Sequence, residues 1–253
     1  MTNRAIKIVK NIGQSRILVE TNSHDALNAA FNSVILNRLR LENYIEKHPA
    51  FLWALEPVEV GIDAPEVVRR MAAAALGAGV GPMAAVAGAI ADLALEAMAP
   101  YKASIAIVEN GGEISVLSRH SVTIGILAPP PISRSIGFLL HPWEMPLGIG
   151  TSSASLGGGF TFGEADLVTI FADDAALADA AATAVCNEVR GPFSDGFLQR
   201  ILSYALSMKG VRGALIIWNG RIGTAGSLPR IVKLQETKES AVETSLIFVE
   251  PSS

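Results

Sequence analysis

The residues with the clearest potential for chemistry are Asp179 and Thr183, which lie four positions apart in the alanine-rich stretch Phe171–Arg190. This stretch predicts the end of a strand, a short acidic turn and a helix. On a helix, a spacing of four places two side chains on one face, one turn apart. A carboxylate and a hydroxyl suit Mg²⁺ or Ca²⁺, which prefer oxygen ligands. The alternative is ordinary helix chemistry, in which Asp179 caps or solvates the helix and Thr183 bonds back to a carbonyl.

A second candidate is the segment 148–159, which holds five glycines and four hydroxyl side chains in twelve residues. Its composition predicts a loop and not a core element. Free backbone N–H groups and unusual glycine dihedrals could cradle phosphate oxygens there. The segment lacks the Gly-Lys-Ser/Thr of a Walker loop and the strand–helix context of a dinucleotide fingerprint. A surface loop without a ligand is the alternative.

A third candidate is the stretch Glu109–Glu113, with the sequence Glu-Asn-Gly-Gly-Glu. Asn-Gly is a common turn pair between two strands, so a plain hairpin turn explains it. The functional interpretation is a turn at a strand end whose amide and acid side chains point into a cleft.

The composition excludes several classes of protein. The chain has 253 residues, 50% of them hydrophobic and 17% charged, with a formal net charge of −4. It is therefore not a disordered chain, and it has no basic excess with which to bind nucleic acid. The single cysteine, Cys186, excludes an intrachain disulfide and a cysteine metal cluster. None of the four histidines is paired at a spacing typical of zinc sites.

The order of the predicted elements favours an α+β fold, with largely antiparallel or mixed sheets flanked by helices. It lacks the strict alternation of a doubly wound parallel sheet. We expect one domain over residues 1–253, with room for two sub-domains. The predicted helices cover about 23–47, 65–77, 83–98, 173–190 and 197–208, and the predicted strands cover 5–10, 16–21, 104–108, 114–117, 121–127, 136–140, 167–171, 214–218, 222–224, 230–234 and 245–249.

The stretch Met71–Ala91 carries no charged residue and is long enough to span a membrane. It consists mostly of alanine and glycine and contains Gly81-Pro82, which would expose backbone groups to lipid. We therefore predict two buried helices around a glycine turn. The first ten residues are not typical of a secretory signal, and we expect a cytoplasmic protein without a membrane partner.

Taken together, these segments resemble the ApbE superfamily, the flavin transferases that move FMN from FAD onto a threonine of an acceptor protein. Gly88 and Asp92 match a helix motif of that family, and Asn110-Gly111-Gly112-Glu113 is similar to its Asn-x-Gly-Gly-Asp/Glu turn with one residue fewer. Thr151-Ser152-Ser153 resembles its Thr-Ser-Gly loop. Ala178–Ala184 resembles its Ala-Asp-Ala-x-Ala-Thr-Ala helix closely.

The chain is more similar still to an uncharacterised bacterial and archaeal branch of that superfamily. The segments that carry this likeness are Val80–Ala89, Val108–Gly112 and Ala178–Ala184. The branch brings no established activity with it.

The resemblance implies that Asp179 and Thr183 bind Mg²⁺ with help from a backbone carbonyl near Ala87. The metal would lie on the diphosphate of FAD and polarise the phosphorus under attack. The glycine-rich segment and the turn at Asn110 would hold the nucleotide. The implied cofactors are Mg²⁺ and FAD, and the implied nucleotide-binding residues are Gly88, Asp92, Asn110, Gly111, Gly112, Glu113, Thr151, Ser152 and Ser153.

The chain departs from the transferase pattern at three positions. Ala87 stands where the family has a lysine, Ala89 where it has an aromatic residue, and Gly158 where the branch predicts a histidine. The sequence therefore assigns no catalytic residue. Three functions stay open: a Mg²⁺-dependent enzyme that transfers FMN from FAD, a non-catalytic protein of the same fold that binds a flavin or another small molecule, and a structural or interaction protein whose glycine-rich segment binds no ligand.

Overall fold

The computed structural model describes residues 5–128, 130, 136–154, 161–234 and 247–251. Its largest element is a sheet of eight strands in which every neighbouring pair is antiparallel. In spatial order the strands are β1 (Ile6–Ile12), β2 (Ser15–Thr21), β3 (Ile105–Asn110), β4 (Glu113–Ser118), β7 (Leu147–Ser152), β8 (Leu167–Ala172), β9 (Val211–Trp218) and β10 (Arg221–Gly226).

A smaller antiparallel sheet has four strands. Its spatial order is β11 (Arg230–Lys233), β6 (Ile136–Leu140), β5 (Val122–Ile126) and β12 (Ile247–Pro251). The helices are α1 (His24–Lys47), α2 (Ala50–Trp53), α3 (Glu66–Ala78), α4 (Val86–Met98), α5 (Ala175–Glu188) and α6 (Asp195–Ser207), with short 3₁₀ turns at Pro82–Ala85, Ala99–Tyr101 and Pro142–Glu144.

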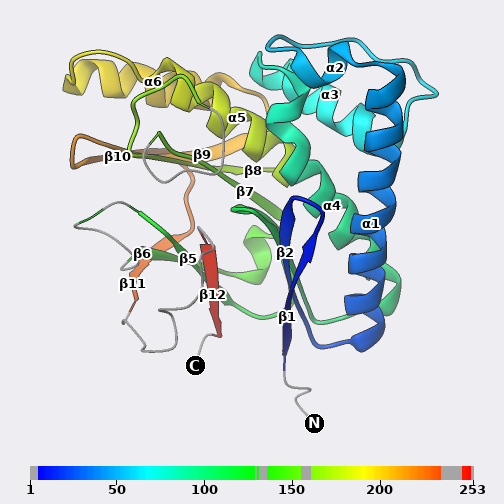
Figure 1. The fold of residues 1–253 in the computed structure, drawn as a ribbon. Helices are drawn as coiled ribbons and strands as arrows, with labels where there is room; N and C mark the ends of the chain where they lie inside the picture. Colours follow the sequence, from blue (N-terminus) through cyan, green and yellow to red (C-terminus); the bar gives the residue numbers. More distant parts are fainter. Residues whose placement is uncertain (1–4, 129, 131–135, 155–160, 235–246, 252–253) are drawn as a thin grey trace.

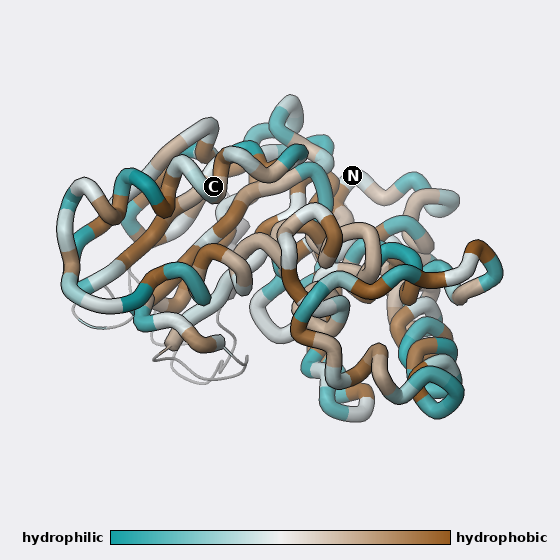
Figure 2. Tube along the Cα trace, turned by 90° about the horizontal axis from the view of Figure 1, so that it is seen from above, coloured by the Kyte–Doolittle hydropathy of each residue, from teal (hydrophilic) through white to brown (hydrophobic). Residues whose placement is uncertain are grey.

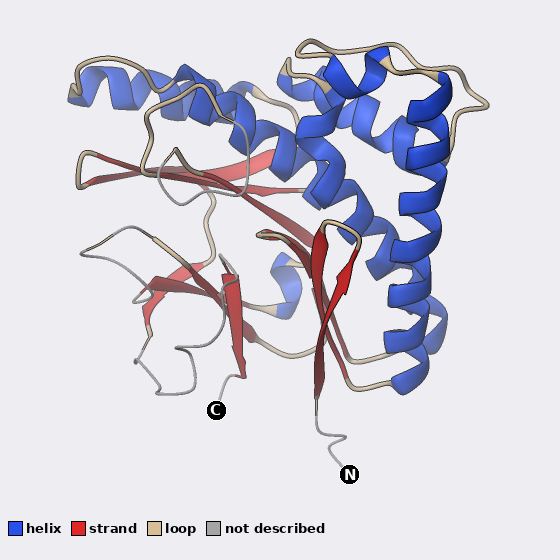
Figure 3. Ribbon diagram, in the orientation of Figure 1, coloured by secondary structure: helices blue, strands red, loops and turns tan. Residues whose placement is uncertain are grey.

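The elements form three layers, as Figures 1 and 3 show. The helices cover one face of the large sheet, and the small sheet lies on the other face. One hydrophobic core fills the space between helices and large sheet, and a second core, which includes Phe138 and Phe171, joins the two sheets. The outer helices change repeatedly between hydrophobic and hydrophilic residues along their length in Figure 2, as expected for helices with one buried face. The predicted α+β class is confirmed.

The start of the segment 148–159 is a buried central strand and not the predicted loop. Leu147–Ser152 forms β7, which pairs with β4 and β8 and has five buried residues. A Cβ atom on Gly148 would lie 2.0 Å from the carbonyl carbon of Asp174, and one on Gly150 would lie 2.3 Å from that of Ala178. The glycines therefore allow α5 to pack directly on the strand. Residues 155–160 lie outside the described residues.

The apolar stretch Met71–Ala91 forms two helices around a glycine turn, as predicted. Helix α3 ends at Ala78, and its C-cap Gly79 has a φ of 72°. Pro82 then begins the 3₁₀ turn that precedes α4. Within the described residues, Pro82–Tyr101 is long and apolar enough to cross a membrane, although half of its apolar window is buried inside the protein. This is weak evidence for a span, because buried core helices pass the same test.

Candidate functional site

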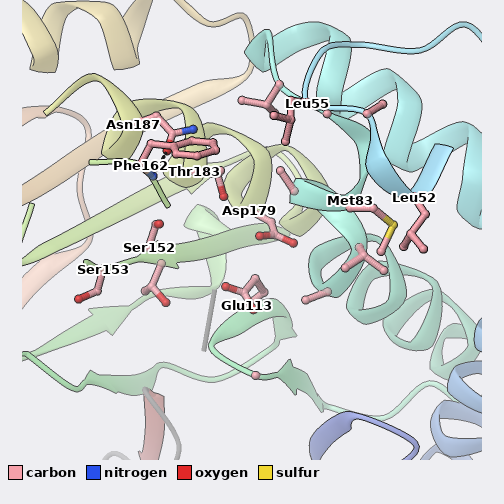
Figure 4. A pocket seen from close by; sticks show the side chains of 18 of the residues that line it. Leu52, Leu55, Met83, Glu113, Ser152, Ser153, Phe162, Asp179, Thr183 and Asn187 are labelled. Atoms are coloured by element: carbon pink, nitrogen blue, oxygen red, sulfur yellow. Dashed lines mark hydrogen bonds between the residues drawn. The ribbon is translucent and has the colours of Figure 1, made fainter. Parts of the chain in front are cut away.

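A cavity of about 600 Å³ lies where α4 and α5 meet the ends of β4 and β7. Its polar wall is formed by Asp179, Thr183 and Asn187 of α5, by Glu113 at the start of β4, and by the segment 151–153 at the end of β7. Figure 4 shows these side chains around the opening. A cavity of this volume with a few converging polar groups is typical of a small-molecule site.

The remaining wall of the cavity is apolar. Leu52, Leu55 and Met83 lie on one side, and Phe162 lies opposite, beside Thr183. Trp53 also lines the cavity while 77% of its surface is exposed. Large exposed apolar side chains around a cavity suit a flat, partly hydrophobic ligand such as a fused ring.

Asp179 is a buried acid of the cavity that is held by a backbone hydrogen bond. It lies inside α5, is 9% exposed, and its Oδ2 accepts a hydrogen bond of 3.0 Å from the N–H of Gly88 near the start of α4. Burial raises the pKa of Asp179 to about 7, against the opposing effect of the N–H groups of Gly88 and Ala87. A carboxyl with a raised pKa in a cavity is a candidate functional group, because a cation would stabilise its charged form.

The donors at this point fit Mg²⁺ better than zinc. The hydroxyl of Thr183 lies one turn along α5 from Asp179, and both residues line the cavity. Across from α5, Thr151 carries a buried Oγ1 that has no hydrogen-bond partner among the described residues. Within that same part of the chain, no group of three or more His, Cys, Asp or Glu side chains could hold a metal. Mg²⁺ needs only one or two carboxylates, since waters and ligand phosphates complete its coordination.

The predicted turn joins β3 to β4 beside this carboxyl. Gly111 and Gly112 have φ values of 69° and 121°, which favour glycine. The Nδ2 of Asn110 donates to the carbonyl of Ala87 at 3.0 Å, so the turn is fastened to the start of α4. Gly111 and Glu113 line the cavity, whereas Asn110 and Gly112 do not.

Glu113 is the second buried acid of the cavity, and Figure 4 shows it close to Asp179. Burial raises its pKa well above the usual value, and the nearby carboxyls of Asp179 and Glu109 raise it further. Neighbouring buried carboxyls repel one another when ionised, and a bound cation would relieve this repulsion. The arrangement of Glu113 and Asp179 is therefore suited to accept a cation.

All three residues of the segment 151–153 line the cavity. The Oγ of Ser153 donates to the carbonyl of Asp166 at 2.6 Å. Ser152 is half-buried at the last position of β7, with its side chain drawn beside that of Ser153 in Figure 4. The hydroxyls predicted to bind nucleotide are therefore brought to the same cavity as Asp179.

Gly88 and Asp92 are not among the residues that line the cavity. A Cβ on Gly88 would lie 2.1 Å from the carbonyl oxygen of Ala175, so this glycine lets α4 and α5 cross closely. The carboxylate of Asp92 is 4% exposed and accepts hydrogen bonds from the N–H groups of Ala175 and Ala176 at 3.0 and 2.9 Å. Both residues hold together the two helices that carry the cavity.

Two of the three positions that depart from the transferase pattern lie among the described residues. Ala87 lines the cavity and offers no side-chain donor there, whereas Ala89 is fully buried in the core. Gly158 lies outside the described residues.

Some cavity residues were not predicted from the sequence. Asn187 is the clearest case, since it follows Asp179 and Thr183 at the same spacing of four and therefore on the same helix face. Its Oδ1 accepts hydrogen bonds from the Oγ1 of Thr161 at 3.0 Å and from the N–H of Phe162 at 2.8 Å. Asn187 thus fixes the segment that brings Phe162 to the cavity.

The protein family described as AbpE bacteria matches residues 2–222 of the chain. A UPF0280 protein of Methanopyrus kandleri is 41% identical over 228 residues, which are 88% of this chain and 92% of the relative. A UPF0280 protein of Methanocaldococcus jannaschii is 40% identical over 225 residues, which are 88% of this chain and 91% of the relative.

Two solved structures are similar in fold. The apo form of the flavinyl transferase ApbE of Pseudomonas stutzeri has a TM-score of 0.57 and 14% identity, covering 88% of this chain and 94% of that one. The ApbE protein of Thermotoga maritima has a TM-score of 0.53 and 14% identity, with 88% and 97% covered. The expected ApbE-like fold is therefore confirmed.

Proposed function

Because this chain belongs to the family described as AbpE bacteria, we propose that it binds FAD or a related nucleotide together with Mg²⁺ and transfers FMN to an acceptor protein. The name of the Pseudomonas stutzeri neighbour, a flavinyl transferase, supports the choice of a flavin. The cavity supports it independently, since it combines an apolar opening for a ring with a polar floor.

The observation that carries the proposal is the position of Asp179. Its buried carboxyl, with the hydroxyl of Thr183 one turn away, faces a cavity whose volume suits a small molecule. Burying an isolated carboxylate costs free energy, and a bound cation would offset this cost by neutralising the charge of Asp179. The opposed apolar side chains Leu55 and Phe162 would hold a flat ring at the opening.

FMN transfer would break the diphosphate bond of FAD, join the FMN phosphorus to the oxygen of an acceptor hydroxyl, pass the hydroxyl proton to solvent and release AMP. Bound Mg²⁺ would supply charge screening and polarisation at the phosphorus under attack. Asp179 and Thr183 would position the metal, and the apolar wall at Leu52 and Met83 would exclude water.

A calorimetric titration of FAD, with and without Mg²⁺, tests the proposal on wild type and Asp179→Asn. The asparagine keeps an oxygen that can accept the N–H of Gly88, so the fold is preserved while the charge is removed. We expect wild type to bind FAD in the presence of Mg²⁺ and Asp179→Asn to bind at least about tenfold more weakly, roughly 1.4 kcal/mol. FAD binding that is identical in the two proteins would refute the metal site.

Asp173→Asn is the matched control, because Asp173 is an exposed acid just before α5 whose partner is Arg212 at 2.7 Å. This variant should bind FAD as wild type does. Thermal unfolding of each variant separates loss of the ligand from loss of the fold.

A second candidate function is flavin binding without transfer. Ala87 favours it, because this position lines the cavity where the transferases carry a lysine, and alanine can neither donate nor accept a proton. Chromatography of a long incubation with FAD, Mg²⁺ and acceptor peptides distinguishes the two functions. AMP together with an acceptor peptide that carries FMN indicates transfer, whereas tight FAD binding without either product indicates a binding protein.

A further inference from the structure

A second cavity, of about 570 Å³, adjoins the first. The two cavities share a wall that includes Ala87, Gly111 and Glu113. Asp179 and Thr183 line the first cavity only. On its far side the second cavity is lined by the start of β2 and by α1. The two cavities are therefore neighbours, and a ligand that reached both would pass these shared residues.

Two arginines from separate elements line this second cavity, Arg16 of β2 and Arg38 of α1. The Arg38 side chain is 14% exposed, and it donates to the Oγ of Ser15 at 2.7 Å and to Glu42 at 3.2 Å. Arg38 is thus paired with an acid and fastened to the β1–β2 turn. Its role is to fix the position of the segment that carries Arg16.

Arg16 has a different environment. It is half-buried, and among the described residues its guanidinium has no hydrogen bond or ion pair with another side chain. Its backbone carbonyl accepts the N–H of Gly111 at 3.3 Å, which ties it to the turn shared by both cavities. A partly buried guanidinium gains from an anionic partner, and its planar group of donors matches phosphate oxygens in a bidentate manner.

We propose that the second cavity binds the phosphate-bearing part of a nucleotide, with Arg16 in direct contact with a phosphate and Arg38 as the residue that positions it. This rests on the proposed function, in which the flat ring occupies the first cavity. The diphosphate would then lie where the two cavities meet, beside Ala87 and Glu113, with the metal pair on its first-cavity side and Arg16 on its second-cavity side. Two adjoining cavities with charged groups near their shared residues suit a dinucleotide better than a mononucleotide.

The test uses the full chain and two variants, Arg16→Gln and Arg40→Gln. Arg40 is the matched control, because it is an exposed arginine of α1 that lines neither cavity. The first probe is inorganic pyrophosphate in metal-free buffer containing a chelator, with binding followed by calorimetry. We expect Arg16→Gln to weaken pyrophosphate binding at least tenfold and Arg40→Gln to leave it unchanged. Equal binding by Arg16→Gln and Arg40→Gln, or no binding by wild type at millimolar pyrophosphate, would overturn the proposal.

The second probe is a pair of flavins with Mg²⁺ present. FAD carries a diphosphate and riboflavin carries none, so Arg16→Gln should weaken FAD binding about tenfold and leave riboflavin binding unchanged. An equal loss for both flavins would mean that Arg16 supports the fold and not an anion, and would overturn the proposal.

The two probes separate this inference from the proposed function. Pyrophosphate binding that depends on Arg16, in a protein that binds no flavin, would support the anion site while refuting the flavin. Mg²⁺-dependent FAD binding that is unchanged in Arg16→Gln would support the proposed function and refute the anion site at Arg16.

Discussion

Asp92 and Asp179 each accept hydrogen bonds from the first turn of the helix that carries the other. Asp92 of α4 accepts the N–H groups of Ala175 and Ala176, the first two residues of α5. Asp179 of α5 accepts the N–H of Gly88, the third residue of α4. Helix N-termini have unpaired N–H groups and a partial positive charge, so each carboxylate stabilises the opposite helix. The two helices that form the cavity therefore fix each other's starting points.

Replacing Asp92 by alanine should destabilise the protein without touching the cavity wall. The variant leaves the N–H groups of Ala175 and Ala176 and the hydroxyl of Ser115 without their acceptor in a buried place. We expect the free energy of unfolding to fall by about 2–4 kcal/mol in urea denaturation at pH 5. Asp195→Ala, in the exposed first turn of α6, should change it by no more than about 0.5 kcal/mol. Equal effects of the two substitutions would contradict this role of Asp92.

The stability of the protein should depend on pH through the same residue. Burial raises the pKa of Asp92 to about 6 from the ordinary 3.8, against the effect of its three hydrogen bonds. A raised pKa means that the folded state holds the proton more tightly than the unfolded state. Its stabilising contribution is complete below pH 3.8 and is lost as the pH rises through 6, on the order of 3 kcal/mol in all.

Urea denaturation of wild type and Asp92→Asn from pH 4 to pH 7 measures this contribution. Asparagine does not ionise, so the free energy of unfolding of wild type minus that of the variant should decrease as the pH rises. A difference that stays constant over this range would show that Asp92 does not titrate between the two states.

Local spacing predicted the pair of α5 residues that line the first cavity. The residues from other elements that line it come together only through tertiary contacts. The pair Asp179 and Thr183 could be found because a helix places residues four apart on one face. The close packing of α5 on Gly150 of β7 could not be predicted, because composition does not distinguish a glycine-rich loop from a strand on which a helix packs closely. Arg16 was not predicted either, because the cavity that it lines requires β2, α1 and the β3–β4 turn to come together. The fold class followed from the order of the elements, which is independent of such contacts.

The close crossing of α4 and α5 makes Gly88 intolerant of a side chain. A Cβ at this position would lie 2.1 Å from the carbonyl oxygen of Ala175, a backbone atom that cannot move alone. We expect Gly88→Ala to lower the free energy of unfolding by roughly 3 kcal/mol, because the helices would have to separate. Gly196→Ala is the matched control, since a Cβ on that glycine of α6 meets nothing within 4 Å. Gly196→Ala should raise the free energy of unfolding by about 0.5–1 kcal/mol. If Gly88→Ala lowered the free energy of unfolding by less than about 1 kcal/mol, the steric argument would be contradicted.

The hydroxyl of Thr183 can be tested separately from the shape of its side chain. Thr183→Val keeps the branched shape and removes only the oxygen that would bind Mg²⁺, so the fold should persist. We expect Mg²⁺-dependent FAD binding to weaken about tenfold, roughly 1.4 kcal/mol, in calorimetry. Thr169→Val is the control, because Thr169 is buried in β8, does not line the cavity, and has an Oγ1 without a hydrogen-bond partner among the described residues. This control should keep its FAD affinity and lose no stability, since it removes an unsatisfied polar atom. If Thr183→Val bound FAD and Mg²⁺ as tightly as Thr169→Val does, then Thr183 would serve only the helix, and Asp179 alone would carry the metal.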